Sequence, residues 1–152
     1  MKSLKNKPRS ERDLYYVAVK AFLEKDGKFF IFKDRYGDWD IPGGRIQRHE
    51  FDVPLDQVLR RKMSEELGGS VRYSLGKPIV FMRHERIEET IGKKVRIFAI
   101  GYQAKLLSGS IRLSDQHVES MWVPINRFDP SGYFEGGWLK GVEEYLKFRR
   151  KA

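Results

Sequence analysis

Acidic side chains and glycines occur together in two short stretches of this 152-residue chain. The glycine pair Gly43 and Gly44 is followed by Glu50, and a later segment carries the adjacent carboxylates Glu65 and Glu66. Neighbouring carboxylates near a glycine turn offer the oxygen ligands that a hard divalent cation prefers. Such an ion can neutralise a diphosphate and orient a water molecule for attack. The residue types and their spacing therefore indicate metal-assisted chemistry on phosphate groups.

Basic residues accompany these carboxylates in the second stretch. Arg61 stands four residues before Glu65, a spacing at which an ion pair in a helix can hold the carboxylate in place. Lys62 stands four residues before Glu66, and two interpretations of it are open. Its ammonium either replaces a bound cation or forms an ordinary ion pair at the surface.

A helix over residues 54–67 is expected to position the second stretch. Pro54 suits the first helical turn, and Gly68 and Gly69 follow the last apolar residue, where glycine commonly ends a helix. Farther towards the N-terminus, Asp26 and Gly27 predict a hairpin turn between the segments 15–23 and 29–32.

The remaining elements are read from β-branched and aromatic runs and from apolar spacing. Strands are predicted at 15–23, 29–32, 71–83, 95–107 and 121–124, and an amphipathic helix at 139–148. In the segment 95–107, Val95, Ile97 and Ala99 are expected on one face and Phe98, Ile100 and Tyr102 on the other. The order of elements is typical of an α+β domain with layered α/β/α packing.

Composition limits the fold and function classes. The length suits one domain, predicted at 13–148, with basic tails at 1–12 and 149–152. The formal net charge is +9, but most of it lies in the two ends, so a nucleic-acid surface is the less favoured interpretation. Cysteine is absent, which excludes disulfides, thiolate metal sites and a cysteine nucleophile. The first residues lack the apolar stretch of a secretory signal and no apolar run approaches membrane-span length, so a cytoplasmic location without a membrane partner is expected.

The two stretches resemble the signature of the Nudix hydrolase family, G-x5-E-x7-R-E-U-x-E-E-x-G-U, where U is a bulky aliphatic residue. Residues 44–50 match G-x5-E, and residues 61–68 match five of the later defining positions. The resemblance covers nearly the whole chain after residue 13. It implies an α/β/α sandwich with a mixed β-sheet, and Mg²⁺ or alternatively Mn²⁺ bound by Glu65, Glu66 and a carbonyl of the glycine turn at Gly44.

Three positions depart from the signature. Ten residues, rather than seven, separate Glu50 from Arg61, and the extra three are expected to enlarge the loop at 51–53 without changing the helix register. Lys62 stands where the family has the first glutamate of its helix, and Gly69 replaces the last aliphatic residue. The loss of a carboxylate at Lys62 predicts fewer bound metal ions than in many family members.

Residues 43–50 and 114–122 are also similar to segments of one branch, the GDP-mannose mannosyl hydrolases. This resemblance implies that His117 is the general base, with Glu119 as an alternative base or further metal ligand. It also implies that Arg45 neutralises the diphosphate. The remaining residues of the predicted substrate-binding set are Arg48, Glu50 and Arg61.

The sequence therefore predicts a Mg²⁺-dependent hydrolase of a nucleoside diphosphate linked to another moiety, such as a nucleotide sugar. The alternatives are a catalytically silent Nudix domain that binds nucleotide or RNA, and an enzyme acting on RNA ends. A small-molecule nucleotide substrate and a homodimer are the expected partners. Trp39, Phe98 and Tyr102 either stack on a nucleobase or pack in the core.

Overall fold

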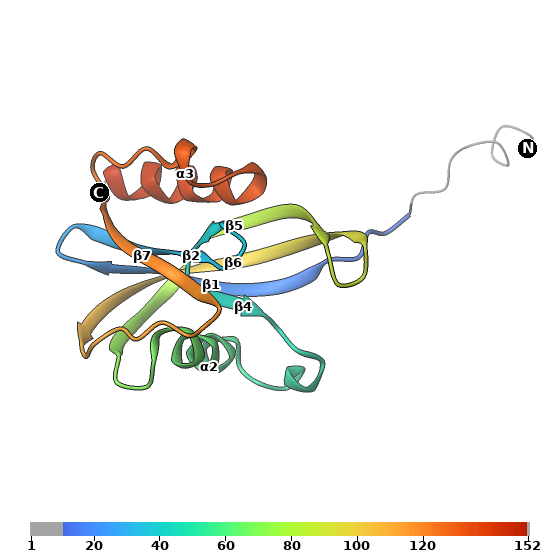
Figure 1. The fold of residues 1–152 in the computed structure, drawn as a ribbon, viewed down its shortest axis with the longest axis horizontal. Helices are drawn as coiled ribbons and strands as arrows, with labels where there is room; N and C mark the ends of the chain where they lie inside the picture. The colour runs from blue at the N-terminus through green and yellow to red at the C-terminus, as the bar shows by residue number, and fades with distance from the viewer. Residues whose placement is uncertain (1–10, 152) are drawn as a thin grey trace, which may run out of the picture.

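The computed structural model describes residues 11–151 and shows a mixed β-sheet between two α-helices (Figure 1). Its elements are β1 (Tyr16–Lys25), β2 (Lys28–Asp34), β3 (Trp39–Asp40), β4 (Gly43–Arg45), the 3-10 helix η1 (Arg48–Glu50), α2 (Leu55–Leu67), β5 (Arg72–Glu88), β6 (Lys93–Ser108), β7 (His117–Pro124), the 3-10 helix η2 (Pro130–Gly132) and α3 (Gly136–Arg150). The strand order is β3-β2-β1-β6-β5, with β4 also paired to β1 and β7 to β2. Strands β1 and β6 run parallel, and the other pairs are antiparallel. The predicted α+β class with a mixed sheet is confirmed.

Two buried clusters lie on opposite faces of the sheet, and the side chains of β1 alternate between them. Ala18 and Phe22 point to the cluster under α3, where Phe22 stacks on Tyr145 with ring centroids 4.0 Å apart. Val19 and Leu23 point to the cluster under α2. A central strand that is buried on both faces explains why β1 is apolar along most of its length.

Strand β6 alternates as the sequence predicts. Ile97 and Ala99 belong to the cluster under α3, whereas Ile100 and Tyr102 pack with the cluster under α2. The predicted hairpin between β1 and β2 is also confirmed. Asp26 and Gly27 both have positive φ angles, 51° and 76°, as a two-residue turn of type I′ requires.

Several elements are longer than predicted because their pairing partners continue. Strand β7 begins at His117 rather than at residue 121, since it pairs with β2 as far as Asp34. Strand β5 extends to Glu88 because it pairs with β6 up to the turn around Gly92. Helix α3 begins at Gly136, three residues before the apolar spacing starts.

Arg149 and Arg150, the first two residues of the predicted basic tail at 149–152, lie in the last turn of α3. Arg149 binds Glu24 at 2.8 Å, and Arg150 donates hydrogen bonds to the carbonyls of Ile125 and Phe128. Basic side chains are favoured at this end of a helix because its free carbonyls carry partial negative charge. Most of the predicted tail at 1–12 lies outside the described residues.

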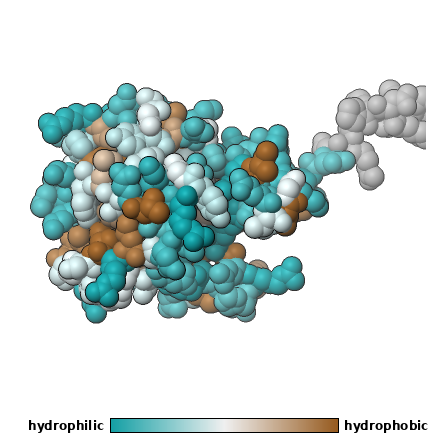
Figure 2. Space-filling model, in the orientation of Figure 1, coloured by the Kyte–Doolittle hydropathy of each residue, from teal (hydrophilic) through white to brown (hydrophobic). Residues whose placement is uncertain are grey.

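The surface is predominantly hydrophilic on the face shown in Figure 2, where hydrophobic residues form separate small patches. Exposed apolar side chains include Phe51, Ile91 and Val118, which come from different parts of the chain. Single exposed apolar side chains of this kind are ordinary on a folded protein. Within residues 11–151, no helix is both long enough and apolar enough to cross a membrane.

Candidate active site

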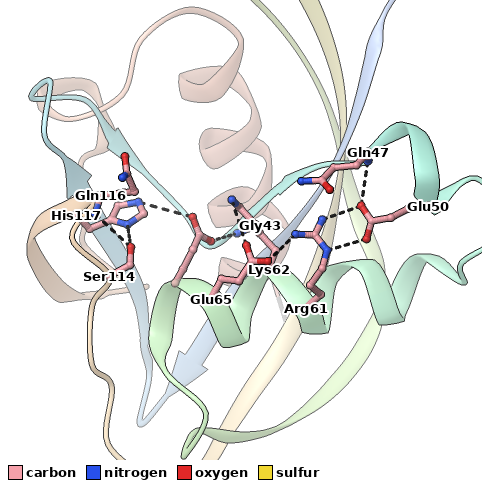
Figure 3. Close-up of polar contacts among 10 residues, drawn as sticks. Gly43, Gln47, Glu50, Arg61, Lys62, Glu65, Ser114, Gln116 and His117 are labelled. Atoms are coloured by element: carbon pink, nitrogen blue, oxygen red, sulfur yellow. Dashed lines mark hydrogen bonds and ion pairs between the residues drawn. The ribbon is translucent and has the colours of Figure 1, made fainter.

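The glycine turn brings β4 against β1 at a distance that only glycine permits. Gly43 has a φ angle of 135°, and a Cβ atom there would lie 2.1 Å from the carbonyl oxygen of Val19. In this conformation the Gly43 N–H donates a hydrogen bond of 2.8 Å to Oε1 of Glu66 (Figure 3). The first and second stretches of the sequence signature therefore meet through a backbone donor and a carboxylate.

Glu66 is buried, with 8% of its surface exposed. Burial raises its pKa to about 7, against the opposing effects of the Lys20 charge, the Gly43 hydrogen bond and the Lys62 charge. On its other side, Oε2 lies 3.7 Å from Nε2 of His117. That distance is too long for a hydrogen bond, so Oε2 keeps lone pairs for another ligand.

Arg61 and Glu50 form a bidentate ion pair that joins α2 to η1. Nε and Nη2 of Arg61 donate to the two carboxylate oxygens of Glu50 at 2.7 and 2.8 Å. The Gln47 N–H adds a third hydrogen bond, and these contacts lower the pKa of Glu50. Arg61 also donates to Glu65 at 3.0 Å, the predicted spacing of four residues. Glu50 is thus bound to its own chain, and the three extra loop residues leave the Glu50–Arg61 pairing intact.

Lys62 pairs with Glu65 rather than with Glu66. Its Nζ lies 3.7 Å from Oε2 of Glu65, and its methylene chain lies against Gly44. The Lys62 charge nevertheless lowers the pKa of the neighbouring Glu66. Both interpretations of Lys62 therefore have a geometric basis, because the side chain is near the surface and near the buried carboxylate.

A cavity of about 340 Å³ opens beside the glycine turn. Its charged lining is mainly cationic, with Glu66 and Asp40 as the acidic members. The charged and aromatic lining residues are Lys20, Asp40, Arg45, Arg61, Lys62, Glu66, Arg86 and Trp138. A concave site with this excess of cations is suited to a polyanionic ligand.

Four of the charged and aromatic lining residues were not predicted from the sequence: Lys20, Asp40, Arg86 and Trp138. Lys20 is 5% exposed, and its ammonium binds both oxygens of Asp40 at 2.8 and 2.9 Å. A lysine inside the apolar run of β1 was a signal that could have marked it. Arg86 and Trp138 carry no such local signal, because β5 and α3 reach the cavity only through the tertiary fold.

A β-bulge separates His117 from Glu119, which two-residue spacing on a strand would place on one face. The register between β7 and β2 pairs Glu119 with Lys33 but His117 with Asp34, so Val118 is an extra residue on β7. His117 consequently stacks on Phe32, with centroids 3.7 Å apart, on the side of Glu66. Glu119 is exposed and pairs with Lys33 at 3.4 Å. The structure thus brings one of the two predicted bases to Glu66.

Burial also favours the neutral form of His117. Its side chain is 8% exposed, and this burial lowers its pKa, so the imidazole is neutral near pH 7. Nδ1 lies 3.4 Å from the hydroxyl of Ser114. His117 does not line the cavity itself, and it is next to the carboxylate that does.

The two predicted anion-binding arginines differ in position. Arg45 lines the cavity, binds Glu88 at 2.8 Å and lies over the ring of Tyr16. Arg48 is exposed in η1 and does not line the cavity.

The three aromatic residues offered for base stacking lie away from the cavity lining. Tyr102 is buried with the cluster under α2, and Phe98 stacks on Phe81 of the neighbouring strand. Trp39 packs against the cluster under α3 and meets Tyr133 edge to face. Packing is therefore what the structure assigns to these rings, and Trp138 is the aromatic side chain of the cavity.

One or two carboxylates of α2 are placed to contribute to a metal site. Within residues 11–151, no three histidine or acidic side chains gather closely enough to hold a metal ion by themselves. Mg²⁺ nevertheless usually binds one or two carboxylates together with waters and substrate phosphates. Glu66 offers an oxygen with free lone pairs, and Glu65 is adjacent on α2, held by Arg61 and Lys62.

Solved structures share this architecture at low sequence identity. The MutT protein from Methanosarcina mazei Go1 has a TM-score of 0.74 at 21% identity, covering 94% of this chain and 100% of that chain. An ADP-ribose pyrophosphatase from Streptococcus suis 89-1591 has a TM-score of 0.63 at 15% identity, covering 90% and 93%. The dihydroneopterin triphosphate pyrophosphohydrolase of E. coli has a TM-score of 0.66 at 13% identity, covering 90% and 99%. These likenesses show the fold.

Sequence comparison supplies the family. No curated protein matches the chain significantly. The model of the NUDIX domain matches residues 14–138, which include the glycine turn, α2 and the whole sheet. Together with Glu66 held by the Gly43 N–H and Arg61 bound to Glu50, this match shows that the chain belongs to the Nudix family.

Proposed function

We propose that this protein hydrolyses a nucleoside diphosphate linked to another moiety, such as a nucleotide sugar, with Mg²⁺ as cofactor. The observation that carries the proposal is the buried carboxylate of Glu66, fixed by a backbone N–H at the wall of a cavity with mainly cationic lining. A diphosphate has the opposite charge and the size to enter such a site. The Glu66 carboxylate would then lie beside the bound diphosphate, where it could hold the metal ion that assists hydrolysis.

In this proposal, different residues of the chain bind the substrate, hold the metal ion and accept the proton. Lys20, Arg45 and Lys62 surround the cavity with positive charge and attract the substrate. Glu66, with Glu65 beside it, would hold Mg²⁺, which supplies charge neutralisation at the diphosphate and a more acidic water. His117 is the favoured proton acceptor, because it is neutral and stands next to Glu66.

Relatives of the same fold support the reaction class and leave the substrate open. One is named an ADP-ribose pyrophosphatase, another a UDP-X diphosphatase, and a third a dihydroneopterin triphosphate pyrophosphohydrolase. Their names share cleavage of linked phosphates and differ in the group attached. The nucleotide-sugar branch, a homodimer and a cytoplasmic location remain predictions from the sequence.

The test is hydrolysis of a panel of nucleotide sugars, dinucleotides and nucleoside triphosphates with Mg²⁺ or Mn²⁺. Glu66→Gln should abolish turnover, and the matched variant Glu143→Gln, at an exposed position of α3, should retain it. Carrying out the reaction in ¹⁸O-water locates the attack. Label in a phosphate product indicates P–O cleavage, and label in the sugar indicates attack at the anomeric carbon.

A catalytically silent binding domain is the second candidate, favoured by one observation. Glu65 is neutralised by Arg61 and Lys62, which leaves Glu66 as the less encumbered metal ligand. If no substrate is turned over and Glu66→Gln binds nucleotides as the wild type does, the hydrolase proposal is wrong. RNA binding is less favoured as the function of such a domain, because Arg149 and Arg150, expected in a basic tail, bind residues of the fold instead.

A further inference from the structure

Lys62 lies between the glycine turn and the cavity. Its methylene chain runs against Gly44 so closely that a Cβ atom on Gly44 would come within 2.6 Å of Lys62 Cε. The side chain lines the cavity and is about one-third exposed, at 32%. The absence of a side chain at Gly44 thus leaves room for the methylene groups of Lys62, whose ammonium lies at the cavity surface.

Three of the four other cations that line the cavity are engaged in short ion pairs. These pairs are Lys20 with Asp40, Arg45 with Glu88 and Arg61 with Glu50, with shortest nitrogen–oxygen distances of 2.8, 2.8 and 2.7 Å. Each of these cations uses at least one donor to hold β1, β4 or α2 in place. An anion that takes those donors would have to break a short ion pair.

The ion pair of Lys62 is longer than these three. Its Nζ is 3.7 Å from Glu65, beyond hydrogen-bond distance, and Glu65 already accepts a 3.0 Å hydrogen bond from Arg61. An ammonium carries three donors, so Lys62 can donate to an incoming anion without breaking a short ion pair. Lysine is also a common phosphate ligand, acting as a point charge.

We propose that the ammonium group of Lys62, on helix α2, binds the diphosphate directly. The protein then retains affinity for a diphosphate when no divalent ion is present. This inference rests on the proposed function, because it assumes that a diphosphate occupies the cavity beside Glu66. It assigns Lys62 a binding role in place of the surface ion pair that its sequence position also allows.

The probe is α,β-methylene-ADP, whose bridging carbon resists hydrolysis, and binding is measured by calorimetry in EDTA and again in Mg²⁺. In EDTA the wild type should bind, and Lys62→Met should bind about tenfold more weakly, the loss of roughly one charge-assisted hydrogen bond. Lys25→Met is the matched control, since it removes the same charge from the exposed end of β1. It should bind as the wild type does.

Gly44→Ala tests the same contact without changing any charge. The added methyl group must displace the flexible end of Lys62, and Gly44 has an ordinary φ angle that alanine can adopt. This variant should lose affinity in EDTA to about the same extent as Lys62→Met. Thermal melting of each variant verifies that the protein remains folded.

The outcomes separate this inference from the function on which it rests. If the wild type binds the probe in Mg²⁺ but not in EDTA, or if Lys62→Met binds like Lys25→Met, the role of Lys62 is refuted and the hydrolase proposal stands. If the wild type binds the probe under neither condition, the proposed function fails as well. Weaker binding by both Lys62→Met and Gly44→Ala supports the inference.

Discussion

At the scale of single residues, the site combines one carboxylate that has an oxygen open to a ligand with one whose oxygens are both occupied. Glu66 is buried with an elevated pKa and one unbound oxygen. Glu50 is also buried, but Arg61 and Gln47 occupy both of its oxygens. The two glutamates belong to the same sequence signature, and their partners decide which of them can receive a ligand.

His117 and Glu119 can be distinguished by mutation. Because His117 alone is next to Glu66, His117→Gln should lower kcat by about 100-fold, the usual contribution of a general base. It should also change the acidic limb of the pH–rate profile, to which protonation of both His117 and Glu66 contributes in the wild type. Glu119→Gln should change kcat less than twofold, and a larger loss in this variant than in His117→Gln would reverse the assignment.

The Glu50–Arg61 pair should make stability depend on pH. The folded-state pKa of Glu50 lies below its ordinary value of 4.5, so the pair contributes fully above pH 4.5. The contribution is lost as the pH falls through the lowered folded-state value.

Urea unfolding at pH 7 and at pH 3 measures this effect. Arg61→Met should have a lower unfolding midpoint than the wild type at pH 7, and the difference should shrink at pH 3. A difference that stays constant across this range would show that the ion pair is not its source.

At the scale of elements, the approach of β4 to β1 depends on Gly43. A Cβ atom at this position would clash with the Val19 carbonyl, and the φ angle of 135° is unfavourable for any other residue. Gly43→Ala should therefore lower the free energy of unfolding by about 3 kcal/mol, measured by denaturant titration. Gly69→Ala is the control, because nothing lies within 4 Å of its Cβ position. Equal stability of the two variants would contradict the role of the close approach.

Local patterns were sufficient to predict much of the fold at this scale. The Asp26-Gly27 turn, the alternation of β6 and the α2 register follow from neighbours in sequence, and all three are found in the structure. The bulge at Val118 could not be predicted, because it is defined by the register of β7 against β2. The ion pair of Lys20 with Asp40 was also missed, because it joins side chains of β1 and β3 that meet only in the folded chain, although the lysine inside the apolar run of β1 was a local signal.

At the scale of the whole molecule, the Tyr145 side chain joins α3 to the part of β1 that follows the cavity residue Lys20. The Tyr145 ring stacks on Phe22, and its hydroxyl donates a 2.6 Å hydrogen bond to Glu24, which also binds Arg149. Burial raises the pKa of Tyr145, so the hydroxyl remains a donor at neutral pH.

Tyr145→Phe should separate stability from activity. Loss of this hydrogen bond should lower the free energy of unfolding by about 1–2 kcal/mol, which calorimetry detects as a fall in Tm of a few degrees. Hydrolysis by the folded variant should equal that of the wild type, since Tyr145 does not line the cavity. A fall in kcat with unchanged Tm would contradict this separation.

The parallel pairing of β1 with β6 has a consequence for how the protein is made. Tyr16 pairs with Ile97 and Glu24 with Lys105, so the central strands are joined by residues about eighty positions apart. Contacts of such high separation slow folding, because a long loop must close before they form. Ala18 and Lys20 on β1 and Ile97 on β6 all line the cavity. A ribosome must therefore synthesise more than half of the chain before a binding site can exist, and substrate can stabilise the protein only after that point.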